Sequence, residues 1–190
     1  MSDYMFIPEH FKRLKRGPQV ILPKDIGIII AYTGVSKNSV CVDAGTGSGW
    51  LAVALARICK HVTSYDIRDE FIKIAEKNKA SEGLENLDIK KKDVTKGIAE
   101  RDVDLVTLDM PNSDKAVRHA HMALKQNGYV CGYLPHTEQV KSFVAALNRY
   151  GFRNILTLEV IVRDMLVREE GTRPSTKGVW HTAYLVFAQA

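Results

Sequence analysis

The sequence predicts an α/β protein with a doubly wound, mostly parallel sheet in a Rossmann-like fold. Three observations predict it. Strand-like apolar runs alternate with helical patterns along most of the 190 residues. A turn rich in glycine joins the first of these runs to a helix. Four successive strand-like runs end in or just before an acidic residue, and these residues are Asp43, Asp66, Asp93 and Asp109.

Composition limits the class of protein. The content of 45% hydrophobic and 26% charged residues is ordinary for one soluble globular domain. The net charge of +5 is compatible with a polyanionic partner. The three cysteines form no C-x-x-C pair, which argues against a zinc site and a disulfide framework. There is no signal-like N-terminus or membrane-length apolar run, so we expect a cytoplasmic protein without metal or membrane association.

The first residues are basic. We expect an N-terminal arm over residues 1–16, followed by one domain over residues 17–190. The arm is interpreted equally well as a solvated segment or as a nucleic-acid contact. The residues at 17–19 then break the chain. A helix is predicted from Pro23, because proline suits a first helical turn and Asp25 suits the helix dipole.

The glycine turn follows a strand predicted to begin at Val40. Its glycines are spaced G-x-G-x-G, one residue shorter than in the dinucleotide motif, and Trp50 stands where the last glycine of that motif would be. This shorter turn is typical of enzymes that bind S-adenosylmethionine, although a turn that only joins strand to helix is the alternative. The candidate cofactor residues here are Asp43, Gly45, Thr46, Gly47, Ser48 and Gly49.

The next predicted strand, over residues 61–66, stops at Asp66. This aspartate lies 17 residues beyond Gly49, close to the offset at which an acidic residue binds ribose hydroxyls. It would equally serve as a cap for the helix predicted over residues 69–81. A third strand is predicted over residues 87–94. Its Asp93 is placed to accept a hydrogen bond from an adenine amino group, with a simple turn residue as the alternative.

The rest of the chain repeats the alternation. Strands are predicted over residues 104–108 and 129–134, with helices over residues 114–125 and 137–150. Two last strands, over residues 154–162 and 181–188, have no helix between them, which predicts one antiparallel strand near the C-terminus. The stretch between these two strands is expected to be irregular.

Asp109 ends the strand expected beside the first one, so it should lie nearest a transferred methyl group. A ring nitrogen becomes cationic when it is methylated. A carboxylate that accepts a hydrogen bond from a neighbouring exocyclic amine would make the ring more nucleophilic and then stabilise the cation. The alternative role for Asp109 is a buried helix cap.

Several segments together resemble the tRNA (adenine-N1)-methyltransferase family, whose members have a class I methyltransferase fold. The resemblance covers the chain from Gly17 onward. The segments that carry it are Gln19–Asp25, Asp43–Gly49, Leu108–Pro111, Tyr133–Pro135, Glu138–Val140, Arg173–Thr176 and His181–Leu185.

The resemblance implies S-adenosylmethionine as cofactor, tRNA as substrate and a homotetramer. It implies that Asp109 is the main active-site carboxylate and also contacts the cofactor, and that Gln19 closes over the cofactor. It further implies a substrate-binding role for Arg173, Thr176 and His181.

The sequence departs from the family in three ways. The usual β-rich N-terminal domain is expected to be missing. Leu22 stands where an aromatic residue is common. Asn112 and Ser113 replace a Pro-Trp-like pair, which makes the pocket floor more polar.

Three functions follow as hypotheses. The leading one is methyl transfer from S-adenosylmethionine to N1 of an adenosine in tRNA. The alternatives are a compact methyltransferase for a small molecule, like the corrinoid-pathway enzymes, and a non-catalytic RNA-binding subunit.

Overall fold

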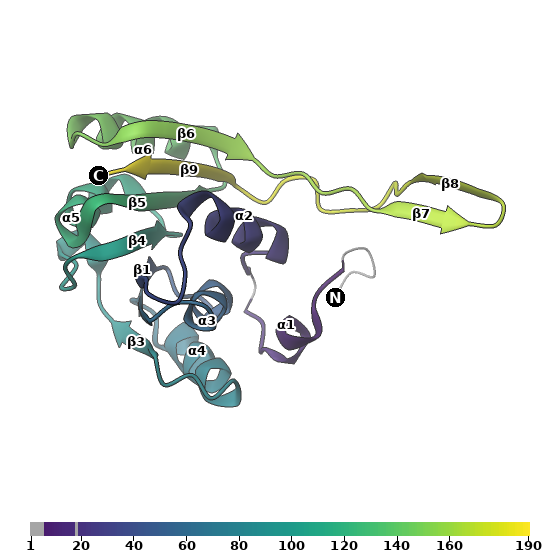
Figure 1. The fold of residues 1–190 in the computed structure, drawn as a ribbon, viewed down its shortest axis with the longest axis horizontal. Helices are drawn as coiled ribbons and strands as arrows, with labels where there is room; N and C mark the ends of the chain where they lie inside the picture. The colour runs from purple at the N-terminus through teal and green to yellow at the C-terminus, as the bar shows by residue number, and fades with distance from the viewer. Residues whose placement is uncertain (1–5, 18) are drawn as a thin grey trace.

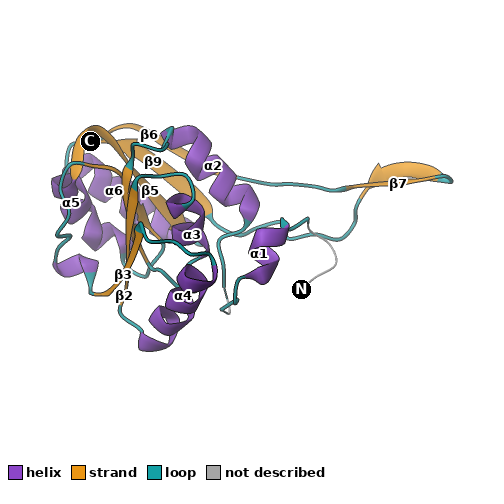
Figure 2. Cartoon of the chain, turned by 60° about the horizontal axis from the view of Figure 1, so that its bottom comes forward, coloured by secondary structure: helices purple, strands orange, loops and turns teal. Residues whose placement is uncertain are grey.

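The fold is built around one seven-stranded sheet. The structure, a computed structural model, describes residues 6–17 and 19–190. Residues 1–5 of the expected arm and Pro18 of the expected chain break lie outside them. The strand order is β3-β2-β1-β4-β5-β9-β6, and helices cover both faces of the sheet (Figure 2). The predicted α/β fold is therefore confirmed.

The sheet is parallel except at one strand. Strand β9 is antiparallel to both of its neighbours, β5 and β6, whereas all other pairs are parallel. The single antiparallel strand near the C-terminus is thus also confirmed. The strands are β1 (Val40–Ala44), β2 (His61–Asp66), β3 (Leu87–Lys91), β4 (Val103–Leu108), β5 (Leu124–Leu134), β6 (Arg153–Glu159) and β9 (Tyr184–Gln189).

The sheet separates the core into two layers, each covered by helices. The main helices on one face are α2 (Pro23–Thr33), α3 (Trp50–Ala56) and α4 (Asp69–Ser81), and those on the other are α5 (Ser113–Ala123) and α6 (Thr137–Arg149). Each layer has its own cluster of buried apolar side chains. Because β1, β2 and β4 are covered on both faces, their residues are almost all buried, as expected for central parallel strands.

Strand β3 and helix α5 end earlier than the ranges 87–94 and 114–125 that the sequence predicts. Strand β3 stops at Lys91, and the side chain of Asp93 then accepts the backbone N–H of Thr95, which starts the short 3₁₀ helix η1 (Val94–Lys96). Helix α5 stops at Ala123, where β5 begins at once. The two last strands are also shorter than predicted, at Arg153–Glu159 and Tyr184–Gln189.

The stretch predicted to be irregular contains a β-hairpin. Its strands are β7 (Met165–Arg168) and β8 (Gly171–Pro174). Figure 1 shows this hairpin projecting far from the sheet. All eight of its strand residues but Leu166 are exposed. The hairpin therefore has no apolar alternation against a core, which is the pattern that would have predicted its strands.

The N-terminal segment packs on the domain. It forms the short helix α1 (Glu9–Arg13), and the side chains of Ile7, Phe11 and Leu14 are buried. The Phe11 ring stacks on Trp50 with a centroid distance of 5.2 Å. The expectation of a solvated arm is therefore wrong for these apolar side chains, because exposed charged residues flank a face that reaches the core.

Candidate active site

The glycine turn brings the ends of β1 and β4 into close contact. Gly45, Gly47 and Gly49 all have positive φ, which favours glycine. A Cβ on Gly45 would lie 1.8 Å from the carbonyl oxygen of Asp109. Only a residue without a side chain permits this approach. The turn therefore fixes Asp109 beside the start of α3.

Asp66 is held at the end of β2 by five N–H donors. Its Oδ2 accepts from the Gly47 amide at 3.0 Å, which ties it to the glycine turn. The Arg68 guanidinium donates to both carboxylate oxygens at 3.0 Å, and the amides of Ile67 and Arg68 donate to Oδ1. Burial would raise the pKa of Asp66, but the hydrogen bonds from Arg68 and Gly47 outweigh it and hold the pKa below its usual range.

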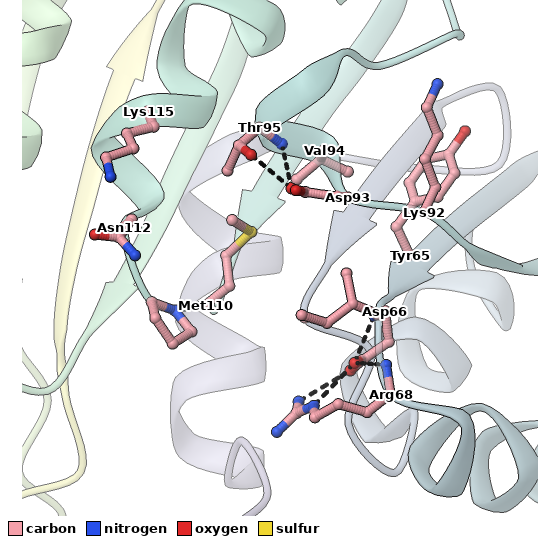
Figure 3. Close-up of a pocket in the computed structure, with 13 residues that line it drawn as sticks. Tyr65, Asp66, Arg68, Lys92, Asp93, Val94, Thr95, Met110, Asn112 and Lys115 are labelled. Carbon is pink, nitrogen blue, oxygen red and sulfur yellow. Dashed lines mark hydrogen bonds and ion pairs between the residues drawn. The ribbon is translucent and has the colours of Figure 1, made fainter.

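A cavity of about 320 Å³ opens beside Asp66 (Figure 3). Asp93 and Val94 line it on one side, and Met110 and Asn112 line it on the other. Asp93 is bound to its own turn, because its Oδ1 accepts from the Thr95 amide at 3.0 Å and from the Thr95 hydroxyl at 2.6 Å. Gly45 also lines this cavity, so the glycine turn forms one of its walls.

Asp109 lies on the other side of Gly45, beside a second cavity of about 30 Å³. Gln19 and Ser48 line the same small space. Within the described part of the chain, the Asp109 carboxylate accepts no hydrogen bond, although its backbone amide donates to the Ala44 carbonyl at 2.8 Å. Burial raises the pKa of Asp109 to about 7; the charge of Asp43 adds to this and that of Arg68 opposes it.

Asp43 differs from Asp109 in having partners for both oxygens. Its Oδ2 accepts from the Ser64 hydroxyl at 2.6 Å, and its Oδ1 accepts from the Thr107 hydroxyl at 2.7 Å. Burial raises the pKa of Asp43, and these two hydroxyls reduce the effect. Asp43 thus joins β1 to both neighbouring strands directly beneath the glycine turn.

The structure brings together most of the predicted cofactor residues. Gln19, Asp43, Thr46, Gly47, Ser48 and Asp109 line the small cavity, Asp66 and Asp93 line the large one, and Gly45 lines both. Gly49 lines neither cavity. It starts α3 against Ala75, which a Cβ would approach to 3.1 Å.

The three predicted substrate residues do not lie together at one site within the single chain. Arg173 lies on β8 of the projecting hairpin, and Thr176 is exposed just after it (Figure 1). His181 lies nearer the sheet: its Nδ1 is 2.5 Å from Glu159 Oε1, and its Nε2 is 3.0 Å from the Pro135 carbonyl oxygen. The Glu159 carboxylate, followed by the Pro135 carbonyl, raises the pKa of His181.

A buried polar network beside the site was not predicted from the local pattern, although its residues lie in three segments that carry the family resemblance. The side chains of Lys24 and Asp25 are 5% and 0% exposed and form an ion pair at 2.8 Å. Asp25 Oδ2 also accepts from the Tyr133 and Thr182 hydroxyls at 3.2 and 2.9 Å. The network therefore fastens the start of α2, which follows Gln19–Leu22, to the ends of β5 and β9. A Lys-Asp pair at a helix start reads as solvent-exposed until its distant partners are known.

Other kinds of site have no support in the described residues. Residues 6–17 and 19–190 contain no group of three His, Cys, Asp or Glu side chains placed to hold a metal ion. None of their helices is both long and apolar enough to cross a membrane. Cys41 and Cys59 are free cysteines, and the Cys41 thiol donates a hydrogen bond to the Cys59 sulfur at 3.6 Å.

The residues around the small cavity fit a polar ligand. Among the described residues, Ser48 Oγ is the one buried side-chain oxygen or nitrogen without a hydrogen-bond partner, and it belongs to the glycine turn. Buried polar atoms normally have partners, which a ligand can supply.

The sheet order, the G-x-G-x-G turn and the acidic residue ending β2 define a class I methyltransferase, the class of enzymes that use S-adenosylmethionine as methyl donor. The family model "tRNA methyltransferase complex GCD14 subunit" matches residues 7–176. The chain belongs to this family.

Individual proteins agree with this assignment. The chain is 38% identical to the tRNA (adenine(57)-N(1)/adenine(58)-N(1))-methyltransferase TrmI of Methanocaldococcus jannaschii, over 98% of this chain and 78% of that protein. A solved SAM-dependent O-methyltransferase from Thermotoga maritima superposes with a TM-score of 0.89 at 34% identity, covering 95% of this chain and 69% of that one. The tRNA (m1A58) methyltransferase TrmI of Aquifex aeolicus superposes with a TM-score of 0.87 at 27% identity, covering 93% and 72%.

Proposed function

We propose that this protein transfers a methyl group from S-adenosylmethionine to N1 of an adenosine in tRNA. The observation that carries the proposal is the carboxylate of Asp109. It stands at the glycine turn with no hydrogen-bond donor from the described chain, and burial brings its pKa to about 7. The family and the relatives named tRNA adenine-N1 methyltransferases support the choice of substrate.

We assign the two cavities to the two ends of the donor. Asp66 would bind the ribose hydroxyls, and Asp93 would accept the adenine amino group in the larger cavity. Gln19, Thr46 and Ser48 would hold the amino-acid end. When bound, S-adenosylmethionine supplies an electrophilic methyl group on its sulfonium. Gln19 lines the smaller cavity, where it would close over the amino-acid end of the donor.

Asp109 acts on the acceptor. N1 of adenine is nucleophilic without losing a proton, so no strong base is required. The ionised carboxylate accepts a hydrogen bond from the neighbouring exocyclic amine and stabilises the positive charge that forms on the ring. Its position beside Gly45 would also orient the base toward the methyl group.

The substrate residues Arg173, Thr176 and His181 would act in a homo-oligomer, for which family resemblance predicts a tetramer. In this arrangement the hairpin of one copy reaches beyond its own domain. The exposure of Met165 (54%) and Val167 (78%) on β7 supports the proposal, because exposed apolar side chains on a projecting ribbon favour association.

One experiment separates the candidate functions. The protein is incubated with methyl-labelled S-adenosylmethionine and unmodified tRNA, and the RNA is digested to nucleosides. We expect label in 1-methyladenosine. Donor binding without label in RNA would favour a small-molecule methyltransferase, and RNA binding without donor binding would favour a non-catalytic subunit. Asp109→Ala should keep donor affinity within several-fold and lose most of the label.

A further inference from the structure

A second groove lies on the other side of the α5 N-terminus from the donor cavity. This α5–α6 groove has a volume of about 440 Å³. Lys115, Arg118 and His119 of α5 line it on one side, and Ser142 and Arg149 of α6 line it on the other. Three cations therefore face one groove, and Asp114 is the single acidic residue in its lining.

The cations of this groove are unpaired. Among residues 6–17 and 19–190, no hydrogen bond or ion pair reaches the side chains of Lys115, Arg118 or Arg149, and all three are exposed. Several cations elsewhere on the surface are paired, such as Lys91 with Asp69 at 2.7 Å and Arg57 with Glu82 at 2.5 Å. Others are not, so the feature of this groove is that three cations line one hollow. Unpaired like charges repel one another, so a polyanion in the groove would relieve this repulsion.

The groove and the donor cavity meet at one residue of α5. Lys115 lines both spaces, and Figure 3 shows it on the same side of the cavity as Asn112. Helix α5 begins four residues after Asp109, so a chain lying in the groove would lie along the helix that follows the end of β4. Lys92, another exposed cation, lines the opposite side of the cavity.

We propose that the α5–α6 groove binds the sugar-phosphate backbone of the RNA substrate beside the target nucleotide. This inference rests on the proposed function and names the surface that the function requires. Arginine and lysine side chains are common donors to nucleic-acid phosphates, and such contacts position the substrate without reading its sequence. The groove thus accounts for RNA binding on the chain's own domain.

The test reverses two charges and compares two matched variants. The groove variant is Arg118→Glu with Arg149→Glu, which leaves Lys115 and the donor cavity intact. The control variant is Lys37→Glu with Lys60→Glu. These two exposed lysines have no side-chain partner among the described residues and lie near the amino ends of β1 and β2, at the opposite edge of the sheet. Both variants change the net charge equally.

Affinity for unmodified tRNA is measured between 50 and 200 mM salt, and affinity for S-adenosylhomocysteine by calorimetry. We expect the groove variant to bind tRNA at least about tenfold more weakly, with a salt dependence shallower by about two counterions. Its affinity for S-adenosylhomocysteine should stay within about twofold of the wild type. The control variant should match the wild type in both measurements.

The outcomes are distinguishable. If wild type methylates tRNA and the groove variant binds it like the control, the groove is not the RNA surface and the proposed function stands. If wild type transfers no methyl group to RNA, the proposed function and this inference both fall. Should the charge reversals unfold the protein, Arg118→Gln with Arg149→Gln removes the same charges more gently and must still lower the salt dependence.

Discussion

Three aspartates at the same edge of the sheet have different environments, and the differences suit different tasks. Asp43 is fully engaged with Ser64 and Thr107 and joins strands. Asp66 is saturated by N–H donors, and its pKa is low. Asp109 accepts no side-chain or backbone donor among the described residues, and burial raises its pKa to about 7. A carboxylate that has no hydrogen-bond donor and a pKa near 7 is the one suited to bind a substrate donor.

The raised pKa of Asp109 predicts the pH dependence of methyl transfer. The ionised carboxylate is the stronger hydrogen-bond acceptor and is the form whose charge stabilises the ring cation, so kcat/KM should rise as pH increases through about 7 and level off above it. A cationic donor favours the ionised form, so the acid limb of kcat should lie at lower pH than that of kcat/KM. The measurement is a pH profile with tRNA as substrate. In Asp109→Asn the residual activity should lack this limb; an unchanged profile would assign it to another group.

In the proposed role of Asp66, the ribose hydroxyls would compete with Arg68 for the Asp66 carboxylate. A carboxylate has about four lone-pair sites, and five N–H groups already donate to Asp66. The guanidinium also stacks on Phe71 at 4.0 Å from the ring centroid, which stabilises this arrangement. If the ribose binds Asp66 as proposed, it displaces the Arg68 side chain, and this displacement costs affinity.

Removing Arg68 should therefore strengthen donor binding. We expect Arg68→Gln to bind S-adenosylhomocysteine about three- to tenfold more tightly, as measured by calorimetry. Arg57→Gln is the matched control, since Arg57 is similarly exposed and pairs with Glu82 away from the cavities. Binding that weakens tenfold in Arg68→Gln would mean that the arginine holds the donor rather than competing with it.

At the scale of elements, the contact between the glycine turn and the end of β4 holds the site together. Gly45 has a φ of +91°, and an added Cβ would lie 1.8 Å from the Asp109 carbonyl oxygen. Gly27 on α2 is the opposite case, because its Cβ would meet nothing within 4 Å. The two glycines therefore allow a paired test of the same substitution.

Gly45→Ala should force β1 and β4 apart at the site. We expect a loss of about 2 kcal/mol or more in the free energy of unfolding, together with loss of donor binding. Gly27→Ala should instead stabilise the protein by about 0.5–1 kcal/mol, because alanine is the better helix former. Denaturant unfolding and calorimetry measure both effects. A Gly45→Ala protein with wild-type stability and donor affinity would show that the close approach is unimportant.

The sequence predicts structure well where burial leaves a local pattern of apolar residues. The central strands are buried on both faces, so their apolar runs stand out, and the glycine turn and strand-end aspartates follow from them. The sequence does not predict the hairpin, because nearly all of its strand residues are exposed and show no apolar alternation. The Lys24–Asp25 pair was missed because its partners, Tyr133 and Thr182, lie more than 100 residues away. The packing of Phe11 on Trp50 is likewise a tertiary contact without a local signal.

At the scale of the whole molecule, the projecting hairpin carries apolar side chains that its own domain does not cover. A two-stranded ribbon is marginally stable alone in water, and this one keeps apolar residues exposed at its base and along β7. Ile161 and Val162 are 58% and 48% exposed where the chain leaves β6. Another copy of the chain is the partner that the proposed homo-oligomer supplies. If another copy covered the hairpin, Arg173 and Thr176 would lie closer to the active site of that copy.

Charged substitutions on β7 should therefore dissociate the protein. We expect wild type to have a mass that is a multiple of 21.3 kDa by light scattering, and Met165→Asp with Val167→Asp to have the mass of one chain. An aspartate buried in an interface is strongly unfavourable, whereas on an exposed surface it costs little. Met122→Asp is the control, since Met122 on α5 is 52% exposed, close to the 54% of Met165. Donor affinity should survive dissociation, because both cavities lie within one chain, while tRNA methylation should fall. A wild type that is already a single chain, or a β7 variant that stays assembled, would remove the hairpin from any role in assembly.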